Sequence, residues 1–129
     1  MATEKLGKAC LIAGGNAPAQ VRTSHKAFVR FLQIAAYNPD LQKQLRMTGV
    51  QLRAHIKALL PIAEEIEKLA PAIAHSGPNA EYPWETPVET VHVPATYSFT
   101  VSSQLRTPKG IKLLNLIIVT LEHAYKFAP

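Results

Sequence analysis

The sequence predicts a mainly α-helical protein with a small β element, a fold of the α+β class. The prediction rests on the spacing of apolar residues. Apolar residues recur at helical spacing over residues 17–37 and 39–75, alternate with polar residues over 91–102, and form a nearly continuous run over 111–121. We therefore expect a helical hairpin with one long helix, followed by one strand and one buried C-terminal helix.

The length of 129 residues predicts a single domain over residues 1–129, because domains usually contain about 100–200 residues. A single cysteine, Cys10, excludes an internal disulfide and an all-cysteine metal cage. The N-terminal residues lack the apolar core of a signal peptide, and the apolar run at 111–121 is far shorter than the roughly 20 residues of a membrane span. We therefore expect a cytoplasmic protein that does not enter a membrane.

The first predicted helix covers residues 17–37. Asn16 is suited to cap its N-terminus. Pro18 is tolerated in the first turn, because a backbone N–H at that position would have no hydrogen-bond partner within the helix. The helix should end at Asn38-Pro39, because a residue before proline resists the α conformation.

The second predicted helix is long and covers residues 39–75. The same Asn-Pro pair provides its cap and first turn, and apolar side chains recur on one face over roughly nine turns. Gly49 weakens this helix, and Pro61 and Pro71 should kink or restart it. At 1.5 Å per residue the helix approaches about 50 Å, so we expect it to pack against the first helix, another chain, or both.

A proline-rich connector over residues 75–90 leads to the clearest strand pattern. Apolar and small polar side chains alternate over 91–102, and Pro94, which cannot donate a ladder hydrogen bond, places the strand at an edge. A lone strand needs a partner. The partner is either a short strand over 9–13 or the same strand of a second copy. If residues 9–13 form no strand, the segment 1–16 is a disordered arm. We favour the second copy and expect a homodimer.

The last predicted helix begins at Thr107-Pro108, a cap followed by a first-turn proline, and covers residues 111–127. Its central residues, LLNLIIVTL, are apolar nearly all round, and Asn115 is their only strongly polar member. A helix of this kind is buried on most sides.

Charge is distributed unevenly along the chain, which has a net charge of +5. Residues 1–60 contain nine Lys or Arg against two acids, residues 61–90 contain six Glu against one Lys, and residues 91–129 contain four Lys or Arg against one Glu. The two basic stretches favour a nucleic acid or another acidic partner.

The basic residues fall on faces of the predicted helices with few acids among them. Such stripes suit phosphate neutralisation, although a solvated face opposite an apolar one is the alternative. Serine and threonine at 96, 98, 100 and 102 form the outer face of the predicted strand, which would suit readout of a DNA groove by a two-stranded ribbon. The candidate nucleic-acid-binding residues are Arg22, Lys26, Arg30, Lys43, Arg46, Arg53, Lys57, Arg106, Lys109 and Lys112.

The sequence shows no catalytic or metal-binding pattern. Its five histidines form no HExxH motif and no paired metal spacing, and Cys10 has no recognisable His or Asp relay. The Gly-Gly-Asn at 14–16 lacks the Lys-Ser/Thr of a P-loop and indicates a cap and turn, and the acidic cluster at 64–67 indicates a solvated face. We therefore expect no enzyme activity, no metal and no cofactor.

Several parts follow one another in a characteristic order. An alanine-rich helix end at 35–36 precedes an Asn-Pro-Asp turn at 38–40 and a long leucine-rich helix over 41–73. A proline-containing strand over 94–101 and a Pro-x-Gly-x-basic helix start at 108–112 follow. This order, over about residues 35–127, resembles a family of regulatory proteins of conjugative elements and related plasmids that includes a ribbon–helix–helix-like activator. Val119-Thr120-Leu121 stands where the family pattern has an aspartate. The resemblance implies DNA binding and transcription regulation by a protein of a mobile element.

These patterns predict a non-enzymatic, dimeric nucleic-acid-binding or regulatory protein that contacts phosphate through basic helix faces. The alternative is a helical interaction or adaptor protein that binds an acidic protein partner, and Trp84 between two prolines either pins the connector to the body or anchors such a partner. Salt separates the two hypotheses, because phosphate contacts weaken steeply with salt whereas an apolar helix-in-groove contact barely responds.

Overall fold

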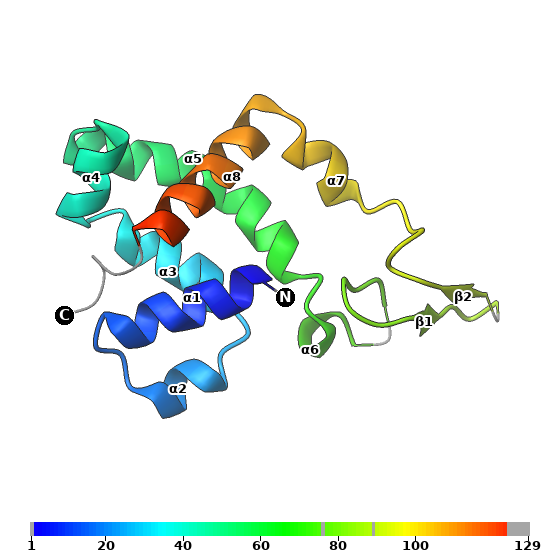
Figure 1. Ribbon diagram of the computed structural model, residues 1–129. Helices are drawn as coiled ribbons and strands as arrows, with labels where there is room; N and C mark the ends of the chain where they lie inside the picture. The colour runs from blue at the N-terminus through cyan, green and yellow to red at the C-terminus, as the bar shows by residue number, and fades with distance from the viewer. Residues whose placement is uncertain (1, 76, 89, 124–129) are drawn as a thin grey trace.

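The computed structural model describes residues 2–75, 77–88 and 90–123 (Figure 1). It is mainly helical with one small antiparallel sheet, as the sequence predicts. The elements are α1 (Ala2–Ala13), α2 (Pro18–Arg22), α3 (Ala27–Ala35), α4 (Pro39–Leu45), α5 (Gly49–Glu67), α6 (Pro71–Ala74), β1 (Trp84–Glu85), β2 (Val91–His92), α7 (Thr100–Leu105) and α8 (Pro108–Glu122). Figure 1 shows a helical body, and an arm that contains α6, β1 and β2 and extends from one end of it.

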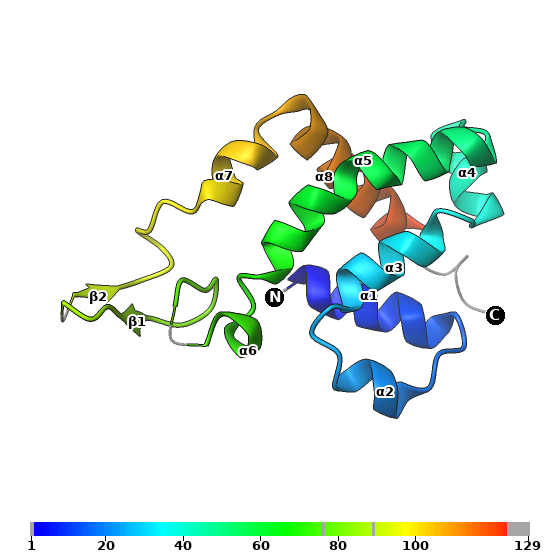
Figure 2. The same ribbon diagram turned by 180° about the vertical axis from the view of Figure 1, so that it is seen from behind.

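The core of the helical body forms around α3 and α5. α3 packs against both α1 and α5, and α7 and α8 pack against α5 (Figures 1 and 2). Phe28 and Leu32 of α3 are fully buried there, together with large side chains of the neighbouring helices: Leu11, Leu52, Ile56, Leu59, Leu113 and Leu116. Each such side chain contributes about 1.5–3 kcal/mol on burial, so this core stabilises the helical body.

Two glycines allow the closest approaches between helices. A Cβ atom on Gly7 would lie 2.6 Å from the carbonyl oxygen of Ala27, so α1 meets the start of α3 because position 7 has no side chain. A Cβ atom on Gly110 would overlap the backbone of Gln104 and Leu105. These two positions therefore join α1 to α3 and α7 to α8.

The N-terminal segment is part of the core. It forms α1, which buries Cys10 and Leu11, so the prediction of a disordered arm or a strand over 9–13 is wrong. Residues 14–16 form a cap and turn, as predicted. The side-chain amide of Asn16 donates to the carbonyl oxygen of Leu11 at 2.9 Å, so Asn16 closes α1 and does not cap α2 as expected.

The predicted helix over 17–37 is two helices, α2 and α3. They are separated at residues 23–26, and the first backbone N–H groups of α3 bond to a distant carboxylate, that of Glu67 in α5. A tertiary contact therefore supplies the new helix start, which no local pattern indicated.

The predicted helix over 39–75 is three helices, α4, α5 and α6. It breaks where Arg46 adopts a left-handed conformation, with a φ of 53°, at the C-terminus of α4. Thr48 then begins α5 with a capping box, because its side chain accepts from the N–H of Gln51 and the Gln51 side chain accepts from the N–H of Thr48. Pro61 lies inside α5 without ending it, whereas α6 starts at the next proline, as expected.

The predicted strand over 91–102 is wrong over most of its length. It begins with β2, which pairs in antiparallel register with β1 of the connector over 75–90 and not with residues 9–13. α7 follows from Thr100 and buries Val101, so the serine and threonine side chains do not form the predicted ribbon. Pairing within the chain removes the strand-based argument for a homodimer, and the dimer stays a prediction.

Four rings hold the arm together. The Trp84 ring stacks on His92 with centroids 5.6 Å apart and meets Tyr97 edge-on at 4.8 Å, and Tyr97 meets Phe99 at 4.9 Å. Trp84 is buried in this cluster, although it is not among the side chains of the main core. Trp84 therefore holds the connector to residues 92–99, and of these rings Phe99 is the one packed against the core of the body, so Trp84 does not itself pin the connector to the body as one of the two alternatives predicted.

α8 begins as the Thr-Pro pattern predicts. The Thr107 side chain caps it by accepting from the backbone N–H of Gly110. The end of the predicted helix, residues 124–127, lies outside the described residues. One face of α8 buries Leu113 and Leu116, but the opposite face is exposed, so the prediction of a helix buried on most sides is wrong.

Candidate nucleic-acid interface

A groove runs along the line where α3 packs against α5, two helices that Figure 2 shows from their exposed side. It consists of two hollows, of about 720 and 370 Å³, which share Gln33 in their lining. We call this depression the α3–α5 groove and define it by its lining residues, which are Ile73 and residues between positions 26 and 37 and between positions 53 and 68.

Helix packing brings four of the predicted phosphate-binding residues to this groove. Lys26 and Arg30 line it from the α3 side, and Arg53 and Lys57 line it from α5. Within each pair the residues are one helical turn apart, and all four are exposed. No described carboxylate lines the hollow that contains Arg53 and Lys57, so this end of the groove is basic.

An exposed aromatic ring lies beside the cations of the basic end. The guanidinium carbon of Arg53 is 5.5 Å from the ring centroid of Tyr37, within cation–π distance. Tyr37 is 68% exposed, so most of this ring remains accessible. An aromatic ring next to a guanidinium suits nucleic acid, because bases stack on rings and phosphates bond to guanidinium groups.

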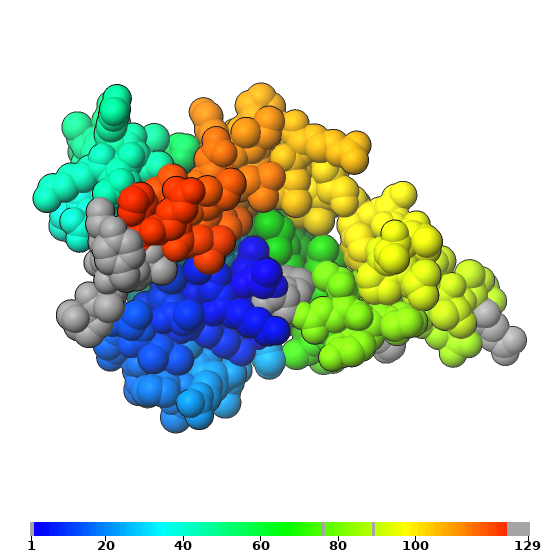
Figure 3. Space-filling view, in the orientation of Figure 1, coloured from blue at the N-terminus to red at the C-terminus, as the bar shows by residue number. Residues whose placement is uncertain are grey.

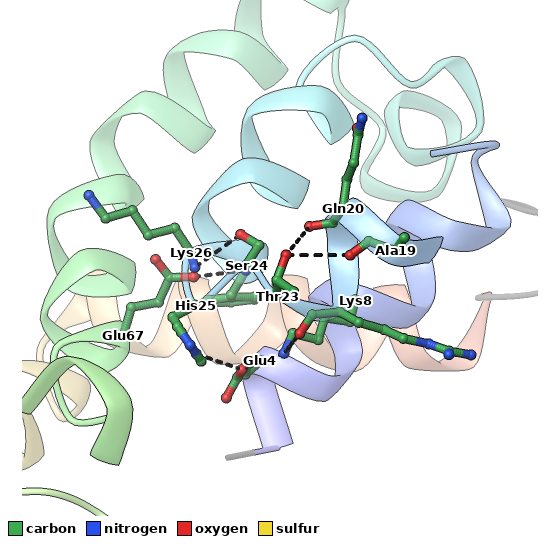
Figure 4. Close-up of polar contacts among 11 residues, drawn as sticks. Glu4, Lys8, Ala19, Gln20, Thr23, Ser24, His25, Lys26 and Glu67 are labelled. Carbon is green, nitrogen blue, oxygen red and sulfur yellow. Dashed lines mark hydrogen bonds and ion pairs between the residues drawn. The ribbon is translucent and has the colours of Figure 1, made fainter. Parts of the chain in front are cut away.

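The buried carboxylate at the other end of the groove caps a helix. Oε1 of Glu67 accepts from the backbone N–H groups of Phe28 and Val29 at 2.8 and 3.1 Å. Figure 4 shows Glu67 next to Lys26, at the start of α3. Burial raises the pKa of Glu67 above its ordinary value, although the two hydrogen bonds and the charge of Lys26 oppose the rise. This carboxylate therefore serves the fold by satisfying the first donors of α3.

The acidic cluster at 64–67 is only partly the solvated face that the sequence predicts. Glu64 is exposed and lines the groove, whereas Glu67 is 4% exposed. Lys68 bonds to Glu65, which raises the pKa of the exposed lysine. This end of the groove therefore has mixed charge, in contrast to the basic end near Arg53.

A second polar cluster, also drawn in Figure 4, joins α1 to the turn before α3. Glu4 pairs with Lys8 at 2.7 Å and lies 3.6 Å from Nδ1 of His25. Burial raises the pKa of Glu4, but the hydrogen bond and charge of Lys8 outweigh it and hold the pKa below its ordinary value. Nζ of Lys8 also donates to the carbonyl oxygen of Arg22, so predicted Arg22 lies against α1 and away from the groove.

The remaining predicted residues lie on other surfaces. Lys43 lies on α4 and Arg46 is its C-cap, whereas Arg106, Lys109 and Lys112 lie around the start of α8. Burial and, to a smaller extent, the charge of Lys112 lower the pKa of His55. Neither His55 nor Lys112 lines the groove. The structure thus gathers four of the ten candidates.

Three residues of the groove were not among the predicted site residues, namely Gln33, Tyr37 and Glu67. In the sequence, Tyr37 is only the last residue of a predicted helix. Its ring lies beside Arg53 and Lys57 because α5 packs against α3. The cap by Glu67 joins residues 39 positions apart, so no local signal could indicate it.

Some kinds of site do not occur in the described part of the chain. Within residues 2–75, 77–88 and 90–123, no group of three or more His, Cys, Asp or Glu side chains could hold a metal ion. The helices of these segments include none that is long and apolar enough to cross a bilayer. Cys10 is buried, and burial raises the pKa of its thiol.

The fold and the groove define a small helical protein with a basic groove that carries an exposed tyrosine. In comparisons with known proteins, no family model, no curated protein and no solved structure matches this chain. The resemblance to regulatory proteins of conjugative elements therefore stays a prediction.

Proposed function

We propose that this protein binds DNA through the α3–α5 groove and contacts the phosphate backbone without reading its sequence. The proposal depends on one observation: two cation pairs from helices that are separate in the sequence line the two ends of one groove. Each phosphate contact releases condensed counterions, so a line of exposed cations binds a polyanion more strongly than the same charges scattered over a surface.

The test is a salt titration of binding to a random-sequence duplex. Arg53→Gln with Lys57→Gln removes the pair at the basic end and keeps helix propensity nearly unchanged. Each lost phosphate contact should flatten the slope of log affinity against log salt by roughly one unit, equally on every duplex. A loss confined to one sequence would mean that these residues read bases and would contradict the proposal.

A matched control removes the same charge elsewhere. Arg106→Gln with Lys109→Gln also lowers the net charge by two, but it leaves the groove intact. We expect the control to keep the wild-type salt slope. If both pairs flatten the slope alike, binding is spread over the whole basic surface and the groove is not the site.

An adaptor that binds an acidic protein is the second candidate, because the same groove has apolar residues in its lining, including Val29, Ile56 and Ile73. An acidic amphipathic helix could lie there with its apolar face down. Non-specific DNA binding gives a Kd of about 10⁻⁴–10⁻⁶ M at physiological salt. Absence of duplex binding at about 100 mM salt would therefore favour the adaptor function over DNA binding.

A further inference from the structure

A stripe of large apolar side chains is exposed on α8. Ile111, Leu114, Ile118 and Leu121 are 50, 41, 50 and 57% exposed. Figure 3 shows α8 lying across one face of the molecule, where no described segment covers it along its length. We call these four side chains the α8 stripe. Exposed apolar side chains that gather on one helix mark an interaction surface.

The α8 stripe has the spacing of a coiled-coil seam. Its members are three, four and three residues apart, which are successive a and d positions of a heptad with Ile at each a and Leu at each d. Leu113 and Leu116, on another face of the same helix, fill the core of the helical body. α8 therefore has two apolar faces, and the fold uses one of them.

We propose that the α8 stripe pairs in antiparallel orientation with the α8 stripe of a second copy of this chain. The spacing reads the same in both directions, so a two-fold axis near position 116 places Ile111 opposite Leu121 of the partner subunit. The same axis places Leu114 opposite Ile118 of the partner subunit. Every layer then combines one Ile with one Leu, as an interface that uses the same patch on both copies requires.

Charge complementarity favours the antiparallel orientation. The N-terminus of α8 has the positive end of the helix dipole, whereas the C-terminus has the negative end and Glu122. Parallel pairing would bring the like-charged ends of two helices together. Antiparallel pairing sets each positive end beside the negative end of its neighbour.

The apolar surface continues beyond the stripe. Leu114 and Ile117 also line a hollow of about 380 Å³ with Val101 and Leu105 of α7. A second copy can fill part of this hollow, which extends the contact beyond one helix. This inference is independent of the proposed DNA binding, although a dimer would carry two α3–α5 grooves.

Sedimentation equilibrium of the full chain tests the pairing. Wild type should have twice the 14.1 kDa mass of one chain in the micromolar range. Ile118→Asp places a charge at the centre of the seam in both copies, so the dissociation constant should rise about 100-fold or more. Ile34→Asp is the matched control, because Ile34 is also 50% exposed but lies on α3, and it should leave the dimer intact.

A charge pair at Asn115 tests the orientation. Asn115 flanks the stripe on its exposed side, and the antiparallel axis brings it near Asn115 of the partner subunit. Asn115→Lys and Asn115→Glu should each weaken self-association through like-charge repulsion, whereas an equimolar mixture should restore a dimer. If the mixture associates no better than the separate variants, the antiparallel orientation is wrong.

Three outcomes would overturn the proposal itself. One is a wild-type mass of 14.1 kDa at every concentration in the micromolar range. Another is that the full chain is monomeric whereas a variant that ends at His123 is dimeric. This result would mean that residues 124–129 of the same chain, and not a second copy, cover the stripe. A folded Ile118→Asp variant, checked by circular dichroism, with wild-type association would exclude the stripe as the seam.

Discussion

The helical body and the arm are stabilised by different kinds of contact. The body has a continuous aliphatic core around Phe28 and Leu32, to which four long helices contribute. The arm has a two-residue strand pair and a cluster of rings around Trp84, which lies outside that core. Phe99, partly buried against the body, is the ring that joins the two.

This difference shows how unevenly stability is distributed along the chain. An isolated two-stranded hairpin is marginally stable at best, so the arm depends on its rings and on its attachment to α5 and α7. Regions with few buried apolar contacts open locally at lower free energy than a closed core. We therefore expect the arm to unfold before the helical body, and the following experiments test that expectation.

The largest effect should come from the centre of the body. Phe28→Ala removes a fully buried ring and should lower the free energy of unfolding by about 3–5 kcal/mol. Urea denaturation followed by circular dichroism measures the loss. Tyr37→Ala is the control on an exposed ring just after α3, and its effect should stay within about 0.5 kcal/mol. Equal effects of the two changes would refute a core centred on α3.

The next effect concerns the tertiary cap of α3. Glu67→Ala leaves two backbone N–H groups without their acceptor and should cost about 1–3 kcal/mol of unfolding free energy. Glu64→Ala, one turn earlier and exposed, should change the free energy by less than about 0.5 kcal/mol. A cost for Glu64→Ala as large as that for Glu67→Ala would argue against the cap.

The pH dependence of stability should reveal the buried charge of the same cap. Because burial raises the pKa of Glu67, the folded protein binds this proton more readily than the unfolded chain between the ordinary and the raised pKa. As pH falls through that window, wild type should therefore gain unfolding free energy relative to Glu67→Gln. The two proteins are compared by urea denaturation from neutral pH down to about 4. A constant difference between them would show that the pKa is not raised.

The smallest effect should be confined to the arm. His92→Ala removes the ring stacked on Trp84 and should cost the arm about 0.5–1.5 kcal/mol. Trp84 is the single tryptophan of the chain, so its fluorescence reports the arm while far-ultraviolet circular dichroism reports the helices. In wild type the fluorescence transition should come at lower urea, and His92→Ala should lower it further without moving the dichroism transition. Coincident transitions in both proteins would mean that arm and body unfold as one unit.

Helix starts that have a local side-chain cap can be predicted from the sequence. The Asn38-Pro39 start is confirmed, since the Asn38 side chain accepts from the N–H of Leu41 at 2.9 Å, and Thr107 caps α8 in the same way. The capping box of Thr48 and Gln51 is equally local and could have been read from the sequence. Each of these contacts joins residues three positions apart, so no distant segment is needed to form it.

The segment over 91–102 was predicted wrongly because packing against other helices decides its structure. Its alternating pattern is typical of a strand, but Val101 and Leu105 also lie one helical turn apart. As part of α7, both can pack toward α5 and α8, and Val101 becomes buried. Burial against α5, which is distant in the sequence, and against the following helix α8 outweighs the local preference of a few β-branched residues.

For the candidate site, the sequence alone determined which residues are basic and where the locally capped helices begin, because composition and local caps depend on a residue and its near neighbours. The tertiary structure decided that Lys26 and Arg30 line one end of a groove and Arg53 and Lys57 line its other end, while the other predicted cations lie elsewhere. It also decided that one face of α8 stays exposed. Both outcomes depend on which helix faces bury their apolar side chains together, and burial is a property of the assembled chain.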